Sequence, residues 1–260
     1  MNYSRLHVPM VYGSLKDRWC VVLKPAGFAA AASHPLPSLE TTLKPFLRRD
    51  RSISFPIRPE KDAEGLAFVT TDDPMRKWID EIVRRGLVRS RYRVLVDLSG
   101  HSPSPGGGSL YRPTGDLVEC GKLSAPEGEG ADSAGTFEFE LYNGSTECPS
   151  DRRTVTALYL VKGASSTKAA RRIRRCLWQA GTPVMFDPVF NAPDVESSQG
   201  MDEDRSKVSG TLAMQLFELQ MPDPFRPKTT LRITAPFPEE WQSVHPLPEL
   251  RGNEDFEDFF

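Results

Sequence analysis

The chain has 260 residues, of which 38% are hydrophobic and 26% are charged, and its formal net charge is −2. This length is enough for one large domain or two small ones with a substantial core, and the near-neutral charge argues against a uniformly basic nucleic-acid binder. No apolar run approaches the ~18 residues that a membrane helix needs, so we expect a soluble protein with no membrane partner.

The first half of the chain predicts three strands and one helix. The apolar run from Trp19 to Pro25 ends in turn residues and predicts a buried strand, and residues 65–70 predict a second one. Asp73 and Pro74 form a favourable helix start, and apolar residues then recur at helical spacing until Gly86. Residues 92–96 predict a third strand.

The second half contains two polar segments among further strands. Residues 98–135 are poor in apolar residues and rich in turn formers, which predicts a long insertion that is largely mobile unless a partner orders it. Residues 193–209 predict a second insertion, and residues 167–180 predict a second helix. Further strands are predicted at 136–142, 154–161, 211–220 and 229–234. Because strands outnumber helices, we expect an α+β fold.

The cysteines and the N-terminus bear on metal binding and on the cellular compartment. None of the four cysteines belongs to a Cys-x-x-Cys pair or has the histidine spacing of a metal site, so we expect reduced thiols and no metal. The first residues lack an apolar signal core and contain one arginine and no acid before Asp17, which permits a short organelle presequence.

Four segments occur in an order that is typical of one enzyme family. They are DRWCVVLKPAGF with its Lys-Pro-x-Gly turn, IRPEKDAEGLAFVTTDD, AARRIRRCLWQAGTPVMFDPVFN, and the closing pair LFELQMPDP and LRITAPFPEEW. Together they resemble the RluA family of RNA pseudouridine synthases over residues 17–241, apart from the two insertions.

The resemblance implies the architecture and the domain limits. It implies a pseudouridine synthase fold, with a mixed, mostly antiparallel sheet, flanking helices and a central RNA-binding cleft. Residues 1–16 are then an N-terminal extension, residues 17–241 form the domain with insertions at about 98–135 and 193–209, and residues 242–260 are an acidic tail. The family uses no cofactor, and we expect none here.

The resemblance also implies the site. The family's catalytic aspartate lies five residues before a glycine, and counting back from Gly65 places Glu60 there. The tyrosine that stacks on the target base matches Tyr92, and the arginine that pairs with the carboxylate matches Arg174. Glutamate keeps the charge but adds a methylene, and a displacement of about an ångström can cost ~100-fold in rate. Asp62 is a less favoured alternative carboxylate.

Basic residues favour RNA binding. The predicted second helix carries Lys168, Arg171, Arg172 and Arg175 in addition to Arg174, which is five basic residues in eight positions. A solvated basic face is the common alternative, but these residues occur where the family has other side chains, which favours phosphate contacts. Arg58 and Lys61, which flank Glu60, are further candidate RNA-binding residues. Much of the acidic charge lies in the 193–209 insertion and in the tail.

These observations lead to one main hypothesis and two alternatives. The main one is a catalytically inactive RNA-binding protein that acts on large-subunit ribosomal RNA during assembly, in the mitochondrion or otherwise in the cytoplasm. Ribosomal or assembly-factor proteins would bind the insertions and the tail. One alternative is an active synthase that uses Glu60 to isomerise uridine in rRNA or tRNA, and the other is a protein-interaction scaffold without RNA.

Overall fold

The structure is a computed structural model, and it describes most of the predicted domain. The described residues are 8–32, 37–47, 51–97, 120–124, 136–142, 153–160, 166–190, 212–226 and 228–242. The predicted insertion at 193–209 and residues 243–260 of the predicted tail lie outside these residues.

Ten strands of the described residues form one sheet. Its main path is β1-β2-β4-β9-β5-β8-β7-β6, while β10 pairs with β9 and β3 pairs with β4. The pairings are antiparallel except between β4 and β9, where Gly65 lies beside Leu216 in a parallel register. The predicted mixed, mostly antiparallel sheet is therefore confirmed. The bounds are β1 Met10–Ser14, β2 Trp19–Lys24, β3 Ser54–Ile57, β4 Glu64–Thr70, β5 Arg89–Asp97, β6 Cys120–Ser124, β7 Thr136–Tyr142, β8 Arg153–Leu160, β9 Met214–Pro222 and β10 Thr230–Thr234.

Two longer helices and two short ones accompany the sheet. They are α1 Leu39–Leu43, α2 Asp73–Arg84, α3 Ser166–Gln179 and α4 Glu239–Gln242. The carboxylate of Asp72 caps α2 by accepting the backbone N–H of Met75 at 3.1 Å, as is typical of helix starts. Both predicted helices are confirmed. No helix within the described residues has the length and apolar character to cross a membrane.

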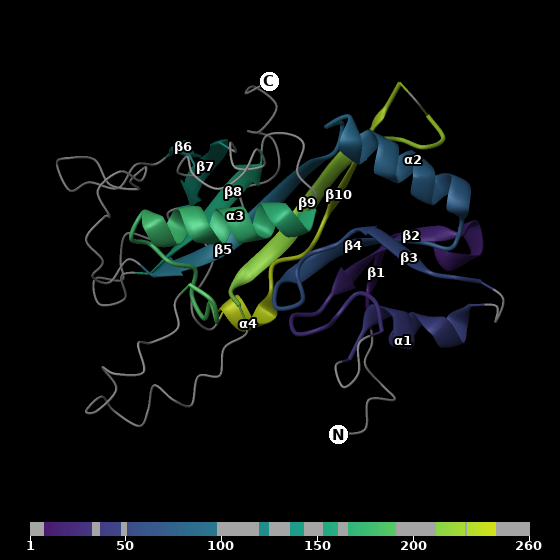
Figure 1. The fold of residues 1–260 in the computed structure, drawn as a ribbon, viewed down its shortest axis with the longest axis horizontal. Coiled ribbons are helices and arrows are strands. Elements are labelled where there is room, and N and C mark those ends of the chain that lie inside the picture. The colour runs from purple at the N-terminus through teal and green to yellow at the C-terminus, as the bar shows by residue number, and fades with distance from the viewer. Residues whose placement is uncertain are drawn as a thin grey trace.

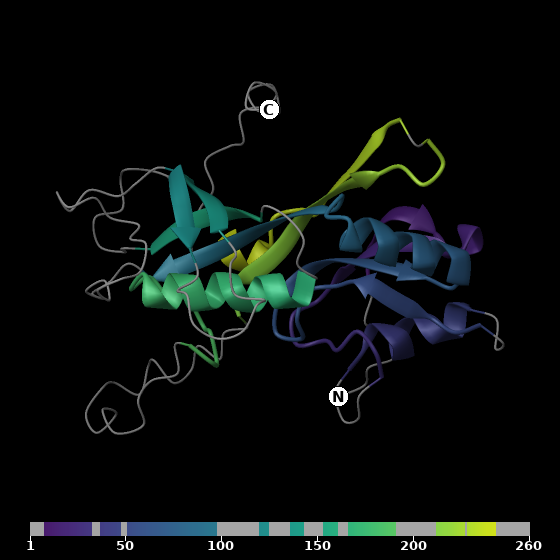
Figure 2. The same cartoon turned by 45° about the horizontal axis from the view of Figure 1, so that its top comes forward.

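The helices cover the sheet as layers. Figures 1 and 2 show α3 lying along the sheet over β5, with α2 beside it over the half formed by β2 and β4. Alternate residues of β2 point to opposite faces: Trp19 and Val21 join the core under α2 and α3, whereas Cys20 and Val22 join a second core under α1. The half of the sheet around β2 and β4 is therefore buried on both faces.

The sheet includes strands that the sequence did not predict. β1 lies within residues 1–16, which the sequence assigned to an N-terminal extension, and β6 lies within the segment 98–135 that was predicted as an insertion. Both are short, and each is formed by antiparallel pairing with a neighbour, β1 with β2 and β6 with β7. The sheet therefore begins at Met10, and strand structure enters the insertion.

Gly65 allows β4 and β9 to approach each other closely. Its φ is +128°, and a Cβ at this position would lie 2.4 Å from the carbonyl oxygen of Leu216. Only glycine fits where two backbones are so close. This approach fixes the start of β4 and, with it, the end of the loop that carries Glu60.

Candidate functional site

Glu60 lies in the loop between β3 and β4, and a buried lysine anchors this loop. The Nζ atom of Lys24 donates to the carbonyl oxygens of Pro25, Phe28 and Lys61, each at 2.9 Å. The N–H of Gly27 also donates to the Lys61 carbonyl at 2.9 Å. The turn after β2 and the Glu60 loop are therefore joined by hydrogen bonds that bury an amine.

The environment of Lys24 changes its protonation. The side chain is fully buried, and this burial lowers its pKa from 10.5 to about 7, although the carboxylates of Asp62 and Glu64 act in the opposite direction. The three carbonyl acceptors match the three N–H bonds of an ammonium group, whereas burial favours the neutral amine. The hydrogen bonds to the ammonium group and the burial of its charge therefore act in opposite directions on the pKa of Lys24.

Arg174 of α3 binds two carboxylates. Its Nε and Nη2 donate to the two oxygens of Asp187 at 2.7 and 2.6 Å, and its Nη1 donates to Glu60 at 2.5 Å. The Asp187 side chain is completely buried, that of Arg174 is 4% exposed, and that of Glu60 is 16% exposed. Asp187 is thus the bidentate, fully desolvated partner, and Glu60 is a single-bonded partner nearer to solvent.

The pKa values of the two carboxyl groups are shifted in opposite directions. Burial raises the pKa of Glu60, and the attraction and hydrogen bond of Arg174 only partly offset this effect. Burial also acts to raise the pKa of Asp187, but the hydrogen bonds from Arg174 and from the N–H groups of Val189 and Phe190 outweigh it, so that pKa is lowered. Asp187 is therefore the more firmly ionised partner of Arg174.

Tyr92 and Phe190 border this ion-pair cluster, and Trp178 lies beside Phe190. Tyr92 of β5 has no exposed surface, and burial, followed by the charge of Glu60, raises its pKa well above the usual range. The guanidinium carbon of Arg174 lies 5.5 Å from the ring centre of Phe190, which lies 6.1 Å from the ring of Trp178. A base can stack on Tyr92 only after the residues that cover it move.

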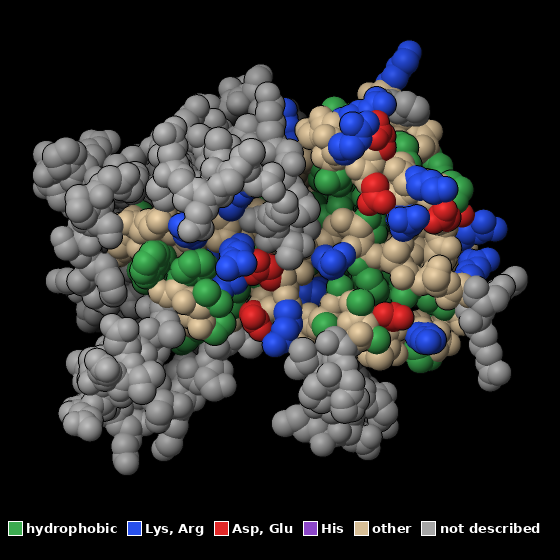
Figure 3. All heavy atoms as spheres, in the orientation of Figure 1, with side chains coloured by type: hydrophobic (Ala, Val, Ile, Leu, Met, Phe, Trp, Pro, Cys, Tyr) green, Lys and Arg blue, Asp and Glu red, His purple; other side chains and the backbone are tan. Residues whose placement is uncertain are grey.

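The candidate RNA-binding residues surround the cluster in part. Arg171 is exposed on α3 and close enough to Glu60 to lower its pKa. Arg175 is also exposed, and Arg172 is half-buried. Figure 3 shows basic and acidic side chains close together near the middle of the face that carries α3.

The remaining candidates lie at the edges of the site. Arg58 is exposed, and its Nη1 donates to the Phe55 carbonyl at 2.7 Å. Lys61 is half exposed and lies 3.8 Å from the carboxylate of Asp62, so Asp62 faces its chain neighbour. Lys168 lies in the first turn of α3.

Sequence reasoning missed Asp187 and Lys24 as parts of the site. Asp187 lies in TPVMFDPVF and is the one acidic residue in an apolar stretch, which signals a buried carboxylate with a partner. Lys24 ends an apolar strand and precedes a proline, and a charged residue in such a run carries the same signal. Neither pattern predicts which residue binds the buried charge.

The cluster places a carboxylate near the surface beside two arginines. No group of three or more His, Cys, Asp or Glu side chains in the described part of the chain could hold a metal ion. The arrangement offers Glu60 as an anion or base, Arg174 as its counter-ion and Arg171 as a nearby cation.

Comparison with known proteins identifies the fold. No family model and no curated protein matches the sequence. Among solved structures, the chain is similar to human RNA pseudouridylate synthase domain containing 4, with a TM-score of 0.60, 14% identity and 89% of each chain covered. It is also similar to human RNA pseudouridylate synthase domain containing 1, with a TM-score of 0.54, 14% identity and coverage of 89% of this chain and 84% of that one. The predicted pseudouridine synthase fold is thereby confirmed.

Proposed function

We propose that this chain binds structured RNA on a pseudouridine-synthase-type fold and that its Glu60–Arg174 pair does not catalyse. The observation that carries the proposal is the ion-pair cluster of Glu60, Arg174 and Asp187 beside the exposed Arg171. Exposed arginines on α3 provide phosphate contacts, and these supply most of the affinity for a nucleic-acid backbone.

Three features support a binding role over chemistry. Glutamate at position 60 extends one methylene further than the family's aspartate. Burial raises its pKa, which disfavours the ionised form that a nucleophile requires. Tyr92 is fully buried, although the resemblance assigns it to base stacking. Arg174 needs Glu60 or Asp187 beside it in any case, because a buried guanidinium without a counter-ion is costly.

One observation favours an active synthase instead. Glu60 and Arg174, which lie 114 residues apart in the sequence, form a direct ion pair, and Tyr92 is close enough to Glu60 for the carboxylate to raise its pKa. The three residues that the resemblance assigns to catalysis are therefore together. In this second candidate function, Glu60 acts at the junction of ribose and base, where the N-glycosidic bond of uridine breaks and the same ring is rejoined to the ribose through carbon. Arg174 orients the carboxylate, and no cofactor takes part.

By analogy with the family, the proposed target is large-subunit ribosomal RNA during assembly, with the mitochondrion as the proposed compartment. Ribosomal or assembly-factor proteins are the proposed partners of the insertions and the tail.

RNA binding is tested by salt-dependent affinity. We expect Arg171→Gln with Arg175→Gln to weaken binding of a structured RNA and to reduce the slope of log affinity against log salt by about two, one for each lost phosphate contact. Arg84→Gln with Arg85→Gln is the control, because it also removes two exposed arginines, at the last residue of α2 and the residue after it, where both pair with Glu81. Equal slopes in all three proteins would contradict RNA binding through α3.

Catalysis is tested separately by pseudouridine mapping. Cells that lack the protein are complemented with the wild type or with Glu60→Ala, and pseudouridine is mapped across cellular RNA. We expect no uridine to depend on the protein and Glu60→Ala to restore any defect in growth or ribosome assembly. A site restored only by the wild type would establish the second candidate function.

A further inference from the structure

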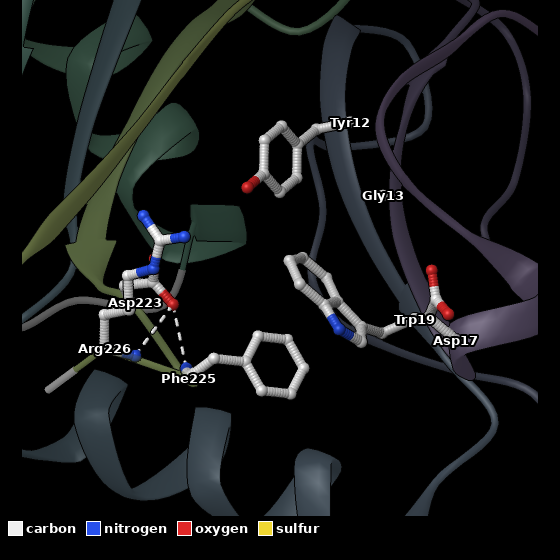
Figure 4. A pocket seen from close by; sticks show the side chains of 7 residues that line it. All are labelled: Tyr12, Gly13, Asp17, Trp19, Asp223, Phe225 and Arg226. Atoms are coloured by element: carbon white, nitrogen blue, oxygen red, sulfur yellow. Dashed lines mark hydrogen bonds between the residues drawn. The ribbon is translucent and has the colours of Figure 1, made fainter.

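A pocket lies away from Glu60, between the N-terminal strands and the β9–β10 turn. Its volume is about 590 Å³, which lies within the range of pockets that hold small ligands. It is lined by Tyr12, Gly13, Asp17, Trp19, Asp223, Phe225 and Arg226. Figure 4 shows the rings of Tyr12, Trp19 and Phe225 around a common space, with Arg226 on the side opposite Trp19.

Trp19 is a rigid base for this pocket. Its indole stacks on Phe68 with ring centres 5.2 Å apart and an angle of 6° between the planes. The rings of Tyr12 and Phe225 lie 5.6 and 6.1 Å from it. The indole N–H is buried and has no hydrogen-bond partner within the described residues, and an unpaired buried donor in a native fold calls for an explanation.

Tyr12 is held in place by an irregular backbone. The pairing of β1 with β2 shifts register between Met10 and Tyr12, and such a bulge redirects the side chains next to it. Gly13 follows with φ +75°, and a Cβ there would lie 3.0 Å from the Trp19 carbonyl oxygen. The sequence thus uses a bulge and a glycine to hold a tyrosine that remains 41% exposed.

Phe225 is exposed at the tip of a well-formed turn. The Oδ1 atom of Asp223 accepts the N–H groups of Phe225 and Arg226 at 2.8 and 3.1 Å, which fixes the turn without any help from the Phe225 ring. The ring is 69% exposed, although exposure of a large apolar side chain to water is unfavourable. Its contact in the described part of the chain is with Trp19 across the pocket.

The polar side chains of the pocket carry both signs of charge. The guanidinium of Arg226 makes no hydrogen bond or ion pair with any described residue, and in Figure 4 it lies across the pocket from Trp19. Asp223 already uses Oδ1 for the turn, and Asp17 points away from the three rings. Lys16 and Lys228 are exposed close by along the chain. Arg226 is the one cationic side chain among the lining residues, and this guanidinium together with the three rings matches a planar base with an adjoining phosphate.

We infer that this pocket stacks an unpaired RNA base between its aromatic rings, with the adjoining phosphate on Arg226. The inference rests on the proposed RNA-binding function and adds a second contact with single-stranded RNA, remote from Glu60. Stacking on aromatic side chains strengthens binding about 5- to 150-fold per base and tolerates any base, because every base has a π face.

The test uses turn residues, because Trp19 belongs to the core and its replacement would disturb the fold. Affinity is measured by fluorescence anisotropy for a labelled stem-loop RNA with an unpaired loop of mixed sequence. We expect Phe225→Ala to weaken binding about tenfold, and Arg226→Gln to weaken it and to lower the salt slope by about one. The control is Phe46→Ala, because Phe46 is 75% exposed in the short helix Lys44–Phe46 and does not line the pocket.

Each outcome separates the two proposals. If the wild type binds no structured RNA, the proposed function itself fails and this inference fails with it. If the wild type binds RNA and the Phe225 and Arg226 variants bind equally well, only the inference is wrong. A variant that keeps its RNA affinity but loses a protein partner would assign the pocket to a peptide and would likewise overturn the inference.

Discussion

The two carboxylates that share Arg174 should differ in what they contribute to stability. Replacement of Asp187 by Asn removes the charge from a fully buried side chain and turns amide hydrogens toward a guanidinium that also only donates. Loss of one partner of a buried pair costs about 3–5 kcal/mol. Because Glu60 still accepts from Nη1, we expect the lower end, about 3 kcal/mol.

Glu60→Gln should cost far less. It leaves the bidentate pair of Arg174 with Asp187 intact, and burial already raises the pKa of Glu60, so its ionised form contributes little net stability. We expect a loss below about 1 kcal/mol. Urea unfolding at neutral pH, followed by tryptophan fluorescence, measures both variants, with equal m-values as the check that the unfolded states are comparable.

The pH dependence provides a second readout for Asp187. In the folded state the pKa of Asp187 lies below its ordinary value of 3.8. Its stabilising contribution is therefore fully present at a pH above the unfolded pKa and is lost as the pH falls through the folded pKa. The stability gap between wild type and Asp187→Asn should therefore close in acid. If Glu60→Gln destabilises the protein as much as Asp187→Asn does, then Glu60 is the main partner of Arg174 and our reasoning is wrong.

Two further predictions concern the scaffold of the site. Lys24→Met should cost about 3 kcal/mol, one for each lost hydrogen bond. The pKa of Lys24 is about 7 in the folded state and 10.5 ordinarily, so between pH 7 and 10.5 the unfolded chain binds a proton at Lys24 that the folded protein does not. The free energy of unfolding of the wild type, relative to that of Lys24→Met, should therefore increase as pH rises above 7. If the difference in stability between the two proteins does not change in alkaline unfolding experiments, the three carbonyl groups hold Lys24 in its ammonium form. Gly65→Ala should prevent folding or destabilise the protein by more than about 3 kcal/mol, because the new Cβ would lie 2.4 Å from the Leu216 backbone. Gly27→Ala should cost only about 1 kcal/mol, because no atom lies within 4 Å of the new Cβ. Thermal unfolding measures both variants, and equal losses of stability would refute the steric argument.

Local sequence patterns were sufficient for most of the regular structure. The capped start and apolar spacing of α2 and the apolar run of β2 are local properties, so the sequence placed both elements within a few residues of their observed bounds. The order of the four family-like segments predicted the mixed sheet. The pairing of Glu60 with Arg174 followed from the resemblance, because no local rule connects residues 114 positions apart.

Tertiary structure decided the features that depend on distant partners. β1 has no strong pattern of its own and becomes a strand by pairing with β2. Asp187 and Glu60 both bind Arg174, and Tyr92 is fully buried.

The aromatic pocket shows the same dependence, because it joins Tyr12 to Phe225 from opposite ends of the chain. Sequence determines such features only through the packed fold, since hydrogen bonds, burial and ring contacts between distant residues exist only after the chain has closed its long loops.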